Sequence, residues 1–174
     1  MKRTFLTLHT AFLLAIPAAA QDSAFGIQLG VVQSTDDDEL DVEFDDTIAE
    51  IYISTELDSG TLLKLKAGRF DTEEGLGIGA PGLEDEGTIE YVAGIIEYRF
   101  YEVFGSTSIY AGPAVYRQEF GSFKETDWGG TVGVNGLFPI TRRLGFTAEV
   151  GYHWANFDSS RTFLTATGGL RVGF

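Results

Sequence analysis

Apolar and polar residues alternate with a period of two along most of the chain after residue 20. This period is typical of β-strands whose two faces meet different surroundings. The last segment, Thr162–Phe174, reads TFLTATGGLRVGF, and in its second half an apolar or small residue falls at every other position up to Phe174. Chain ends are usually polar and frayed unless something holds them. The pattern therefore predicts a final strand that the fold requires.

Eight segments show this alternation, and each is expected to form a strand. One face is apolar and aromatic, as in Phe25, Ile27 and Leu29, and the other carries glycine, threonine and charge. The expected strands cover residues 24–33, 47–57, 61–70, 88–100, 108–119, 128–138, 144–154 and 162–174.

Two of these segments have an ambiguous phase. In 88–100, Ile95 and Ile96 are adjacent, and we place Ile96 on the apolar face with Val92, Tyr98 and Phe100 because Glu97 and Arg99 then share the other face. The segment 108–119 contains Pro113. Proline cannot donate a ladder hydrogen bond, so we expect a bulge or an edge-like position there.

The connections alternate in length. Asp58-Ser59-Gly60 is a three-residue hairpin loop with glycine where a positive φ is favoured. The other short turns are expected at 101–107 and 139–143, whereas 34–46 and 71–87 are long and acidic, with two shorter loops near Gly121 and Asn156. Short turns are therefore predicted at one end of the sheet and long loops at the other.

Alternation alone does not say which face points outward, because a soluble lipocalin-type barrel shows the same period with its apolar face inside. The polar face here is rich in Gly, Thr and Ser with isolated charges, which suits a narrow interior better than a soluble exterior. Aromatic residues also gather near the strand ends, as two membrane interfaces would select. The expected belts contain Phe25, Phe100, Tyr101, Phe104, Phe138 and Phe174 toward the short turns, and Phe120, Phe123, Trp128, Tyr152 and Trp154 toward the long loops.

Strands of about ten residues, even in number and tilted, match the thickness of a bilayer's hydrocarbon layer. An open sheet edge would leave backbone groups unpaired in hydrocarbon, so a membrane-spanning sheet must close on itself. The predicted fold is all-β: an eight-stranded antiparallel up-and-down transmembrane β-barrel in which the last strand pairs with the first.

Residues 1–20 have the features of a secretory signal peptide: Lys2 and Arg3, an apolar stretch at 12–16, and Ala18-Ala19-Ala20 before Gln21. The expected barrel domain is 21–174. Without the first twenty residues, ten basic residues face 26 acidic ones, for a net charge of −16. This balance excludes nucleic acid as a partner, since phosphates require Lys and Arg. The chain has no cysteine and hence no disulfides.

Charged residues on the polar face are expected inside the barrel. Buried charge is costly unless it is paired, so we predict one connected polar network formed by Glu50, Glu56, Lys64, Lys66, Glu97, Arg99, Glu149 and Arg171. Eight strands enclose a space that side chains fill, so no wide pore is expected. A narrow ion-conducting path through the network remains an alternative.

The long loops hold 14 of the 26 acidic residues, within 34–46 and 71–87. Asp36-Asp37-Asp38 offers oxygen ligands, but neither loop has the spaced ligands and turn glycine of a dedicated calcium site. We therefore expect diffuse attraction of divalent cations and no specific metal site or cofactor.

A signal peptide, eight alternating strands and an ending in LRVGF together resemble the small outer-membrane β-barrel domains of Gram-negative bacteria, the OmpA/OmpX type. The resemblance covers the whole chain after residue 20 and implies a monomer in the lipid of the cell outer membrane. It also implies that the last strand is a signal to the outer-membrane barrel assembly machinery, a pattern matched by Leu170, Val172 and Phe174. Unlike full-length OmpA, the sequence carries no peptidoglycan-binding domain after the barrel.

Lipid-A deacylases are also eight-stranded barrels, and their pattern places a histidine two residues before a nucleophilic serine. Here His153 is followed two positions later by Ala155. A histidine without a nucleophile cannot run acyl transfer, and Ser159 and Ser160 fit ordinary loop chemistry, so no enzyme activity is expected. The predicted function is a structural or surface-interaction protein that presents its loops to the outside. The main alternative is a soluble periplasmic lipocalin-like binder of an apolar ligand.

Overall fold

The computed structural model describes residues 23–35, 46–72, 87–102, 105–120, 123–157 and 160–174. These residues form eight strands, and no helix among them is long and apolar enough to cross a membrane. The strands are β1 (Ser23–Ser34), β2 (Asp46–Asp58), β3 (Thr61–Thr72), β4 (Gly87–Glu102), β5 (Gly105–Phe120), β6 (Phe123–Pro139), β7 (Leu144–Ala155) and β8 (Arg161–Gly173).

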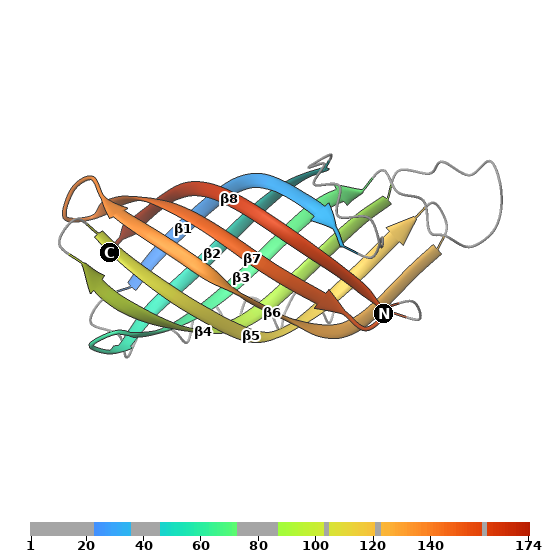
Figure 1. The fold of residues 1–174 in the computed structure, drawn as a ribbon, viewed down its shortest axis with the longest axis horizontal. Coiled ribbons are helices and arrows are strands. Elements are labelled where there is room, and N and C mark those ends of the chain that lie inside the picture. The colour runs from blue at the N-terminus through green and yellow to red at the C-terminus, as the bar shows by residue number, and fades with distance from the viewer. Residues whose placement is uncertain (1–22, 36–45, 73–86, 103–104, 121–122, 158–159) are drawn as a thin grey trace.

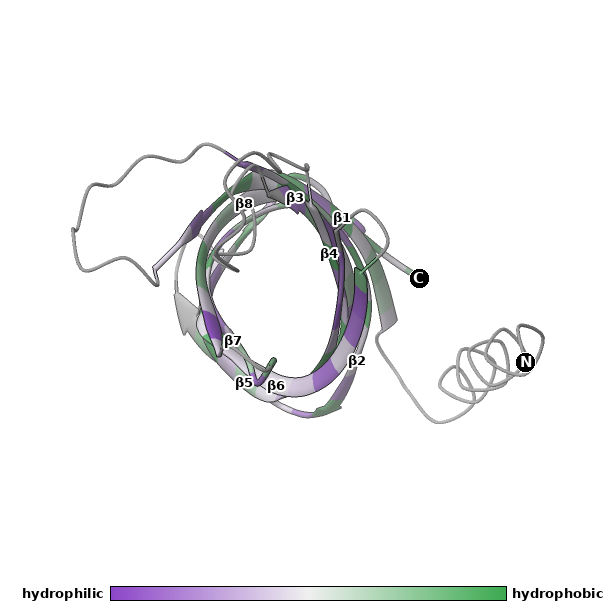
Figure 2. Ribbon diagram, turned by 90° about the vertical axis from the view of Figure 1, so that its right-hand side faces the viewer, coloured by the Kyte–Doolittle hydropathy of each residue, from purple (hydrophilic) through white to green (hydrophobic). Residues whose placement is uncertain are grey.

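The strands close into a single antiparallel barrel, as predicted. Each pairs with its neighbours in sequence, and β8 returns to pair with β1, from Ala24 opposite Gly173 to Ser34 opposite Phe163. The backbone N–H of Phe174 donates to the carbonyl of Ser23 at 2.9 Å and extends this closure to the last residue. Figure 1 shows the strands tilted across the barrel, and Figure 2 shows the closed ring from the side that faces right in Figure 1.

The two ambiguous strands have defined phases. In β4, Val92, Ile96, Tyr98 and Phe100 point outward and Glu97 is buried inside, so the preferred phase is confirmed. In β5 the even-numbered residues from Ser108 to Gln118 face the inside of the barrel. The odd-numbered Ile109 and Val115 are exposed on the outside. The predicted turn at 101–107 is shorter than expected, because β4 runs to Glu102 and β5 starts at Gly105.

Of the two alternatives expected at Pro113, a bulge or an edge-like position, the structure shows the edge-like position. Pairing of β4 with β5 is interrupted between the pairs Ala93↔Ala114 and Ile96↔Ala111, yet the register is the same on both sides. Proline has no backbone N–H to donate to β4, so the hydrogen-bond ladder between β4 and β5 loses bonds there. No extra residue is inserted into either strand, as a bulge would require. On its other side, Pro113 keeps its place opposite Gly130 of β6. The result is a local break in the ladder within an otherwise regular wall.

The loop between β2 and β3 is the hairpin turn that the sequence predicted. Gly60 has φ of 121°, a backbone conformation that other residues rarely adopt. The N–H of Thr61 donates to Oδ1 of Asp58 at 3.1 Å, and the register shifts by a residue between Glu56 and Asp58. This turn sets the phase of both strands, so Glu50 and Lys66 point to the same side of the wall.

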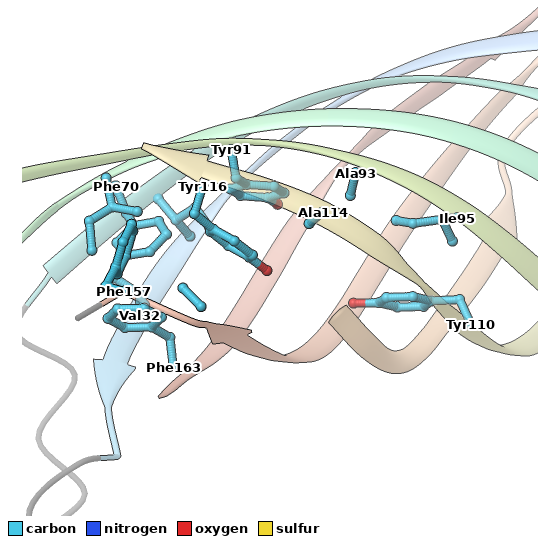
Figure 3. Close-up of a cluster of buried hydrophobic side chains, with 13 residues drawn as sticks. Val32, Phe70, Tyr91, Ala93, Ile95, Tyr110, Ala114, Tyr116, Phe157 and Phe163 are labelled. Atoms are coloured by element: carbon cyan, nitrogen blue, oxygen red, sulfur yellow. The ribbon is translucent and has the colours of Figure 1, made fainter. Parts of the chain in front are cut away.

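The interior is layered along the barrel axis. Toward the end where the long segments 36–45 and 73–86 connect the strands, buried rings and aliphatic chains pack together (Figure 3). Phe70 and Phe163 meet there edge to face with ring centroids 4.9 Å apart. Together with Tyr116 of the same buried cluster, we call them the aromatic layer. Nearer the short turns the interior is polar and charged. We refer below to these as the loop end and the turn end of the barrel.

Candidate functional site: the apolar wall and the charged interior

The outer face of the wall is apolar and exposed. Leu29 is 64% exposed, Ile96 61% and Ile51 51%, although each lies in the middle of a regular strand. A soluble barrel would place such residues in its core, because each large aliphatic side chain gains about 1.5–3 kcal/mol from burial. The wall of this chain therefore requires an apolar surrounding on the outside.

Aromatic side chains mark both rims of the apolar wall. Phe25, Phe100, Phe138 and Phe174 are exposed toward the turn end. Phe123, Trp128 and Tyr152 are exposed toward the loop end, and Trp154 is half-buried there. The side chains of Tyr101, Phe104 and Phe120, which the sequence also assigned to these belts, lie outside the described part of the structure. On β6 the stretch from Phe138 to Trp128 spans about 25 Å along the axis, given about 3.4 Å per residue and a strand tilt near 40°.

Five of the eight predicted interior charges meet in the middle of the barrel. Lys66 of β3 is 1% exposed, and its Nζ donates to Oε2 of Glu50 at 3.1 Å and to Oε1 of Glu149. Nζ of Lys64 lies 2.5 Å from Oε2 of Glu97 and 3.8 Å from Oε2 of Glu149. Since Glu149 lies on β7 and both lysines on β3, the two ion pairs of Glu149 cross the lumen, whereas Glu50 and Glu97 pair with the lysines from the neighbouring strands. We call these five residues the interior charge cluster.

Neutral side chains complete the coordination of the three carboxylates. The hydroxyl of Tyr110 donates to Oε1 of Glu149 at 2.7 Å, and the hydroxyl of Tyr91 donates to Oε1 of Glu50. Oε1 of Glu97 accepts from Oγ of Ser108 at 2.6 Å and from Nδ2 of Asn135 at 3.3 Å. Buried carboxylates need such donors, because the desolvation of a charge costs several kcal/mol.

The other three predicted charges lie toward the turn end. Nη1 of Arg99 is 3.8 Å from Oε2 of Glu56, a longer ion pair with more solvent access than the interior charge cluster. Arg99 and Arg171 line a small cavity together with Lys64 and Glu97. The structure thus places all eight residues on the inner face and distributes them between a tight central group and a looser group at the turn end.

Inward tyrosines are the main interior residues that the sequence pattern missed. Tyr91, Tyr110 and Tyr116 are buried, and the first two are hydrogen-bonded to the interior charge cluster. A signal was present: Tyr91 of β4 lies directly opposite Gly68 of β3, and Tyr110 of β5 directly opposite Gly133 of β6. A Cβ on Gly68 would lie 2.4 Å from Cε1 of Tyr91, so the glycine makes room for the ring.

His153 lies inside the barrel next to the aromatic layer. Its Nδ1 is 3.0 Å from the hydroxyl of Tyr116, which also donates to the carbonyl of Gly130 at 2.9 Å. The ring of Tyr91 meets the imidazole edge to face at 4.9 Å. The histidine is therefore held as an interior polar residue, and Ala155, at the position where the deacylase pattern has serine, is also buried.

The three residues matched to the assembly signal form a stripe on the outer face of β8. Leu170, Val172 and Phe174 are all exposed, Phe174 by 64%. They face away from the lumen, whereas Arg171 between them points inward. The stripe is thus accessible to another molecule that approaches the barrel from outside.

Two groups of sequence predictions fall on residues that the structure does not describe. The proposed signal peptide, 1–20, lies outside the described residues. So do most acidic residues of 34–46 and 71–87, including Asp36-Asp37-Asp38. Among the described residues, no three His, Cys, Asp or Glu side chains gather as they would around a metal ion.

No protein-family model matches the chain, and no curated protein matches it. Its fold does match solved structures. Neisserial surface protein A has a TM-score of 0.65 at 12% identity, covering 88% of this chain and 96% of that one. Ail, the attachment invasion locus protein of Yersinia pestis, has a TM-score of 0.58 at 14% identity, covering 89% and 99%. The N-terminal β-barrel domain of Pseudomonas aeruginosa OprF has a TM-score of 0.56 at 14% identity, covering 87% and 97%.

At these identities the likeness is one of fold. It agrees with the closed ring, the apolar outer wall and the charged interior described above. The chain therefore has the fold of the small eight-stranded outer-membrane β-barrels, which confirms the fold predicted from its sequence.

Proposed function

We propose that this chain is an integral protein of the bacterial outer membrane, anchored by its barrel and presenting its long acidic segments at the surface in a structural or surface-interaction role. The observation that carries the proposal is the inverted arrangement of the wall: large apolar side chains are exposed on the outside while Lys66, Glu50 and Glu149 are buried inside. Only an apolar medium makes the outer face favourable. The name of Ail as an attachment invasion protein agrees with a surface role.

The arrangement argues against the soluble lipocalin-like alternative. Such a binder needs an apolar cavity inside, whereas the middle of this lumen holds three carboxylates and two ammonium groups bonded to one another. Heat-modifiable migration on a detergent gel, together with fractionation of cell membranes, tests the proposal. The barrel should run faster when unheated and should stay with the outer membrane. A monomeric protein that is soluble without detergent would overturn the membrane assignment.

We also infer that the barrel carries no wide pore. Two features support this: ion pairs join β3 to β7 across the lumen, and Phe70, Phe163 and Tyr116 belong to a cluster of buried side chains inside the barrel toward the loop end. Single-channel recording in planar bilayers tests the inference, with a general porin as the positive control. Stable conductance steps as large as those of the porin would refute it.

We propose that the outward stripe of Leu170, Val172 and Phe174 is read by the barrel assembly machinery, and that the barrel works as a monomer without an enzymatic activity. The stripe is exposed and lies on the strand that closes the ring. The absence of a serine two residues after His153 supports the non-enzymatic assignment.

A further inference from the structure

Buried oxygen atoms without hydrogen-bond partners line one side of the polar part of the lumen. Oδ1 of Asn135 on β6, Oε2 of Glu149 on β7 and Oγ1 of Thr167 on β8 have no hydrogen-bond partner within the described part of the chain. The three residues are only 6%, 4% and 7% exposed. Buried polar atoms are normally hydrogen-bonded, so a group of three on adjacent strands requires an explanation.

The strand register brings these oxygens to one level of the barrel. Asn135 lies directly opposite Glu149, and Glu149 lies directly opposite Thr167. Side chains paired in this way have Cβ atoms about 5 Å apart on the same face of the sheet. On β1, Gly30 lies opposite Thr167 and has no side chain, and the next inward residue toward the turn end is Gln28, whose Oε1 is also buried without a partner. We call these four residues the oxygen row.

The charge beside the oxygen row is negative by one unit. The interior charge cluster has three carboxylates but two ammonium groups, and both ammonium groups come from β3, across the lumen from β7. Nζ of Lys66 donates to Oε1 of Glu149, whereas Nζ of Lys64 lies 3.8 Å from Oε2, too far for a hydrogen bond. The inward arginine of β8, Arg171, is four residues from Thr167, about 13 Å along the strand. Oε2 of Glu149 is therefore the carboxylate oxygen with the least compensation.

The chemistry of the row suits a small metal cation. Carboxylate, amide and hydroxyl oxygens are the ligands that hard cations prefer. Calcium takes about 6–8 such oxygens, usually with several carboxylates, whereas the row has one carboxylate and faces two ammonium groups. A single positive charge matches the single negative charge that the interior charge cluster leaves over.

We propose that the oxygen row is a binding site for a monovalent metal cation such as sodium inside the closed barrel. Glu149 supplies the charge through Oε2, and the amide oxygens of Asn135 and Gln28 and the hydroxyl of Thr167 supply the remaining protein ligands. The bound ion neutralises the interior charge cluster from the side opposite the lysines. The small cavity at the turn end is also lined by Asn135, so an ion can approach the row from that side.

The dependence of barrel stability on sodium tests this assignment. The barrel is refolded into micelles of an uncharged detergent, and urea unfolding is followed by tryptophan fluorescence in sodium chloride or in choline chloride at equal ionic strength. One bound ion lowers the unfolding equilibrium constant about tenfold for each tenfold rise in sodium above the dissociation constant. We expect this dependence in sodium and none in choline, because the methyl groups of choline keep oxygen ligands away from its charge.

Thr167→Val removes one oxygen of the row at nearly constant shape. This variant should lose most of the sodium dependence, while its unfolding midpoint in choline stays the same or rises, because an unpaired buried hydroxyl has been removed. A loss of packing alone would instead lower the midpoint equally in both salts. Thr167→Ser keeps the oxygen and should keep the sodium dependence.

Thr131→Val is the matched control. Thr131 of β6 also has a buried hydroxyl without a hydrogen-bond partner among the described residues, but it lies four residues from Asn135, about 13 Å along the strand. Its substitution should leave the sodium dependence unchanged. Heat-modifiable migration identifies folded samples, and only these are compared.

Equal stability of the wild-type barrel in sodium and choline would overturn the assignment, because the row would then hold water alone; this comparison needs no variant. Retention of the full sodium dependence in Thr167→Val would also overturn it, as would an equal loss in Thr131→Val, which would place the effect of sodium elsewhere. None of these outcomes bears on the surface role proposed above, which membrane fractionation tests separately.

Discussion

Replacement of Lys66 by methionine removes the cation that Glu50 and Glu149 share. Methionine preserves most of the side-chain length, so the change is one of charge. In the wild-type barrel the interior charge cluster has three carboxylates and two ammonium groups, and the variant leaves Lys64 alone with all three carboxylates. Glu50 then keeps only the hydroxyl of Tyr91 among its hydrogen-bond partners described above.

The magnitude follows from the geometry. The Lys66–Glu50 pair at 3.1 Å corresponds to an attraction of about 5 kcal/mol at an effective dielectric constant of 20. Desolvation of the ions offsets part of it, and the removal of one partner from a buried pair costs about 3–5 kcal/mol. We expect the Lys66→Met variant to lose that much free energy of unfolding, measured by urea titration in phosphatidylcholine vesicles with tryptophan fluorescence.

Two further variants make the experiment specific. Lys124→Met applies the same change to an exposed ion pair with Glu119 and should leave the free energy of unfolding close to that of wild type. Adding Glu149→Gln to Lys66→Met restores the original net charge of the interior charge cluster. The double variant should therefore recover part of the lost free energy of unfolding. If Lys66→Met is no less stable than Lys124→Met, or if the second substitution only adds to the loss, the interior charge cluster does not hold the barrel together.

Three other predictions address different parts of the barrel. Gly68→Ala places a Cβ 2.4 Å from the ring of Tyr91 and should cost about 1–3 kcal/mol in urea titration, whereas Gly94→Ala, with nothing within 4 Å of the new Cβ, should cost less than 1 kcal/mol; equal effects would refute the Tyr91–Gly68 fit. Deletion of Phe174 should lower the amount of barrel in the outer-membrane fraction severalfold while Phe174→Tyr, which keeps the aromatic ring, should not; normal assembly of the deletion would contradict the assembly role. Calcium titration calorimetry should show only weak heat that about 0.5 M salt abolishes, because diffuse attraction is screened; a saturable, salt-resistant site would show that the acidic segments bind calcium specifically.

Strand number, order and facing could be predicted from the sequence because a single period of two encodes both faces of every strand. The Asp58-Ser59-Gly60 turn also allowed the register of β2 with β3 to be predicted, because this register is set by the local chemistry of the turn. The inward position of Glu50, Lys64, Lys66 and Glu149 followed from the same alternation.

The contacts between these residues could not be predicted in the same way. Whether Glu149 of β7 reaches Lys66 of β3 depends on the stagger of the whole barrel, which is shared among all eight pairings. Tyr110 and Tyr116 escaped prediction because an aromatic residue suits either face, and neighbouring apolar residues left the phase of β5 open. At Pro113 the sequence correctly indicated lost pairing, but whether the strand bulges or skips bonds depends on its neighbours.

The ion pairs across the lumen also affect how the barrel acquires its stability. Lys64 and Lys66 lie on β3, whereas Glu149 lies on β7, 83 residues after Lys66, so its carboxylate can pair with them only once β7 has been added to the sheet. The aromatic layer likewise joins Phe70 of β3 to Phe163 of β8. In a sheet without β7 and β8, Lys66 and Lys64 can pair only with Glu50 and Glu97 of the neighbouring strands. The contacts of Glu149 and half of the aromatic core are missing, and these contacts of high sequence separation form together at closure. Assembly of this barrel should be highly cooperative, with little stability in any fragment that lacks its last two strands.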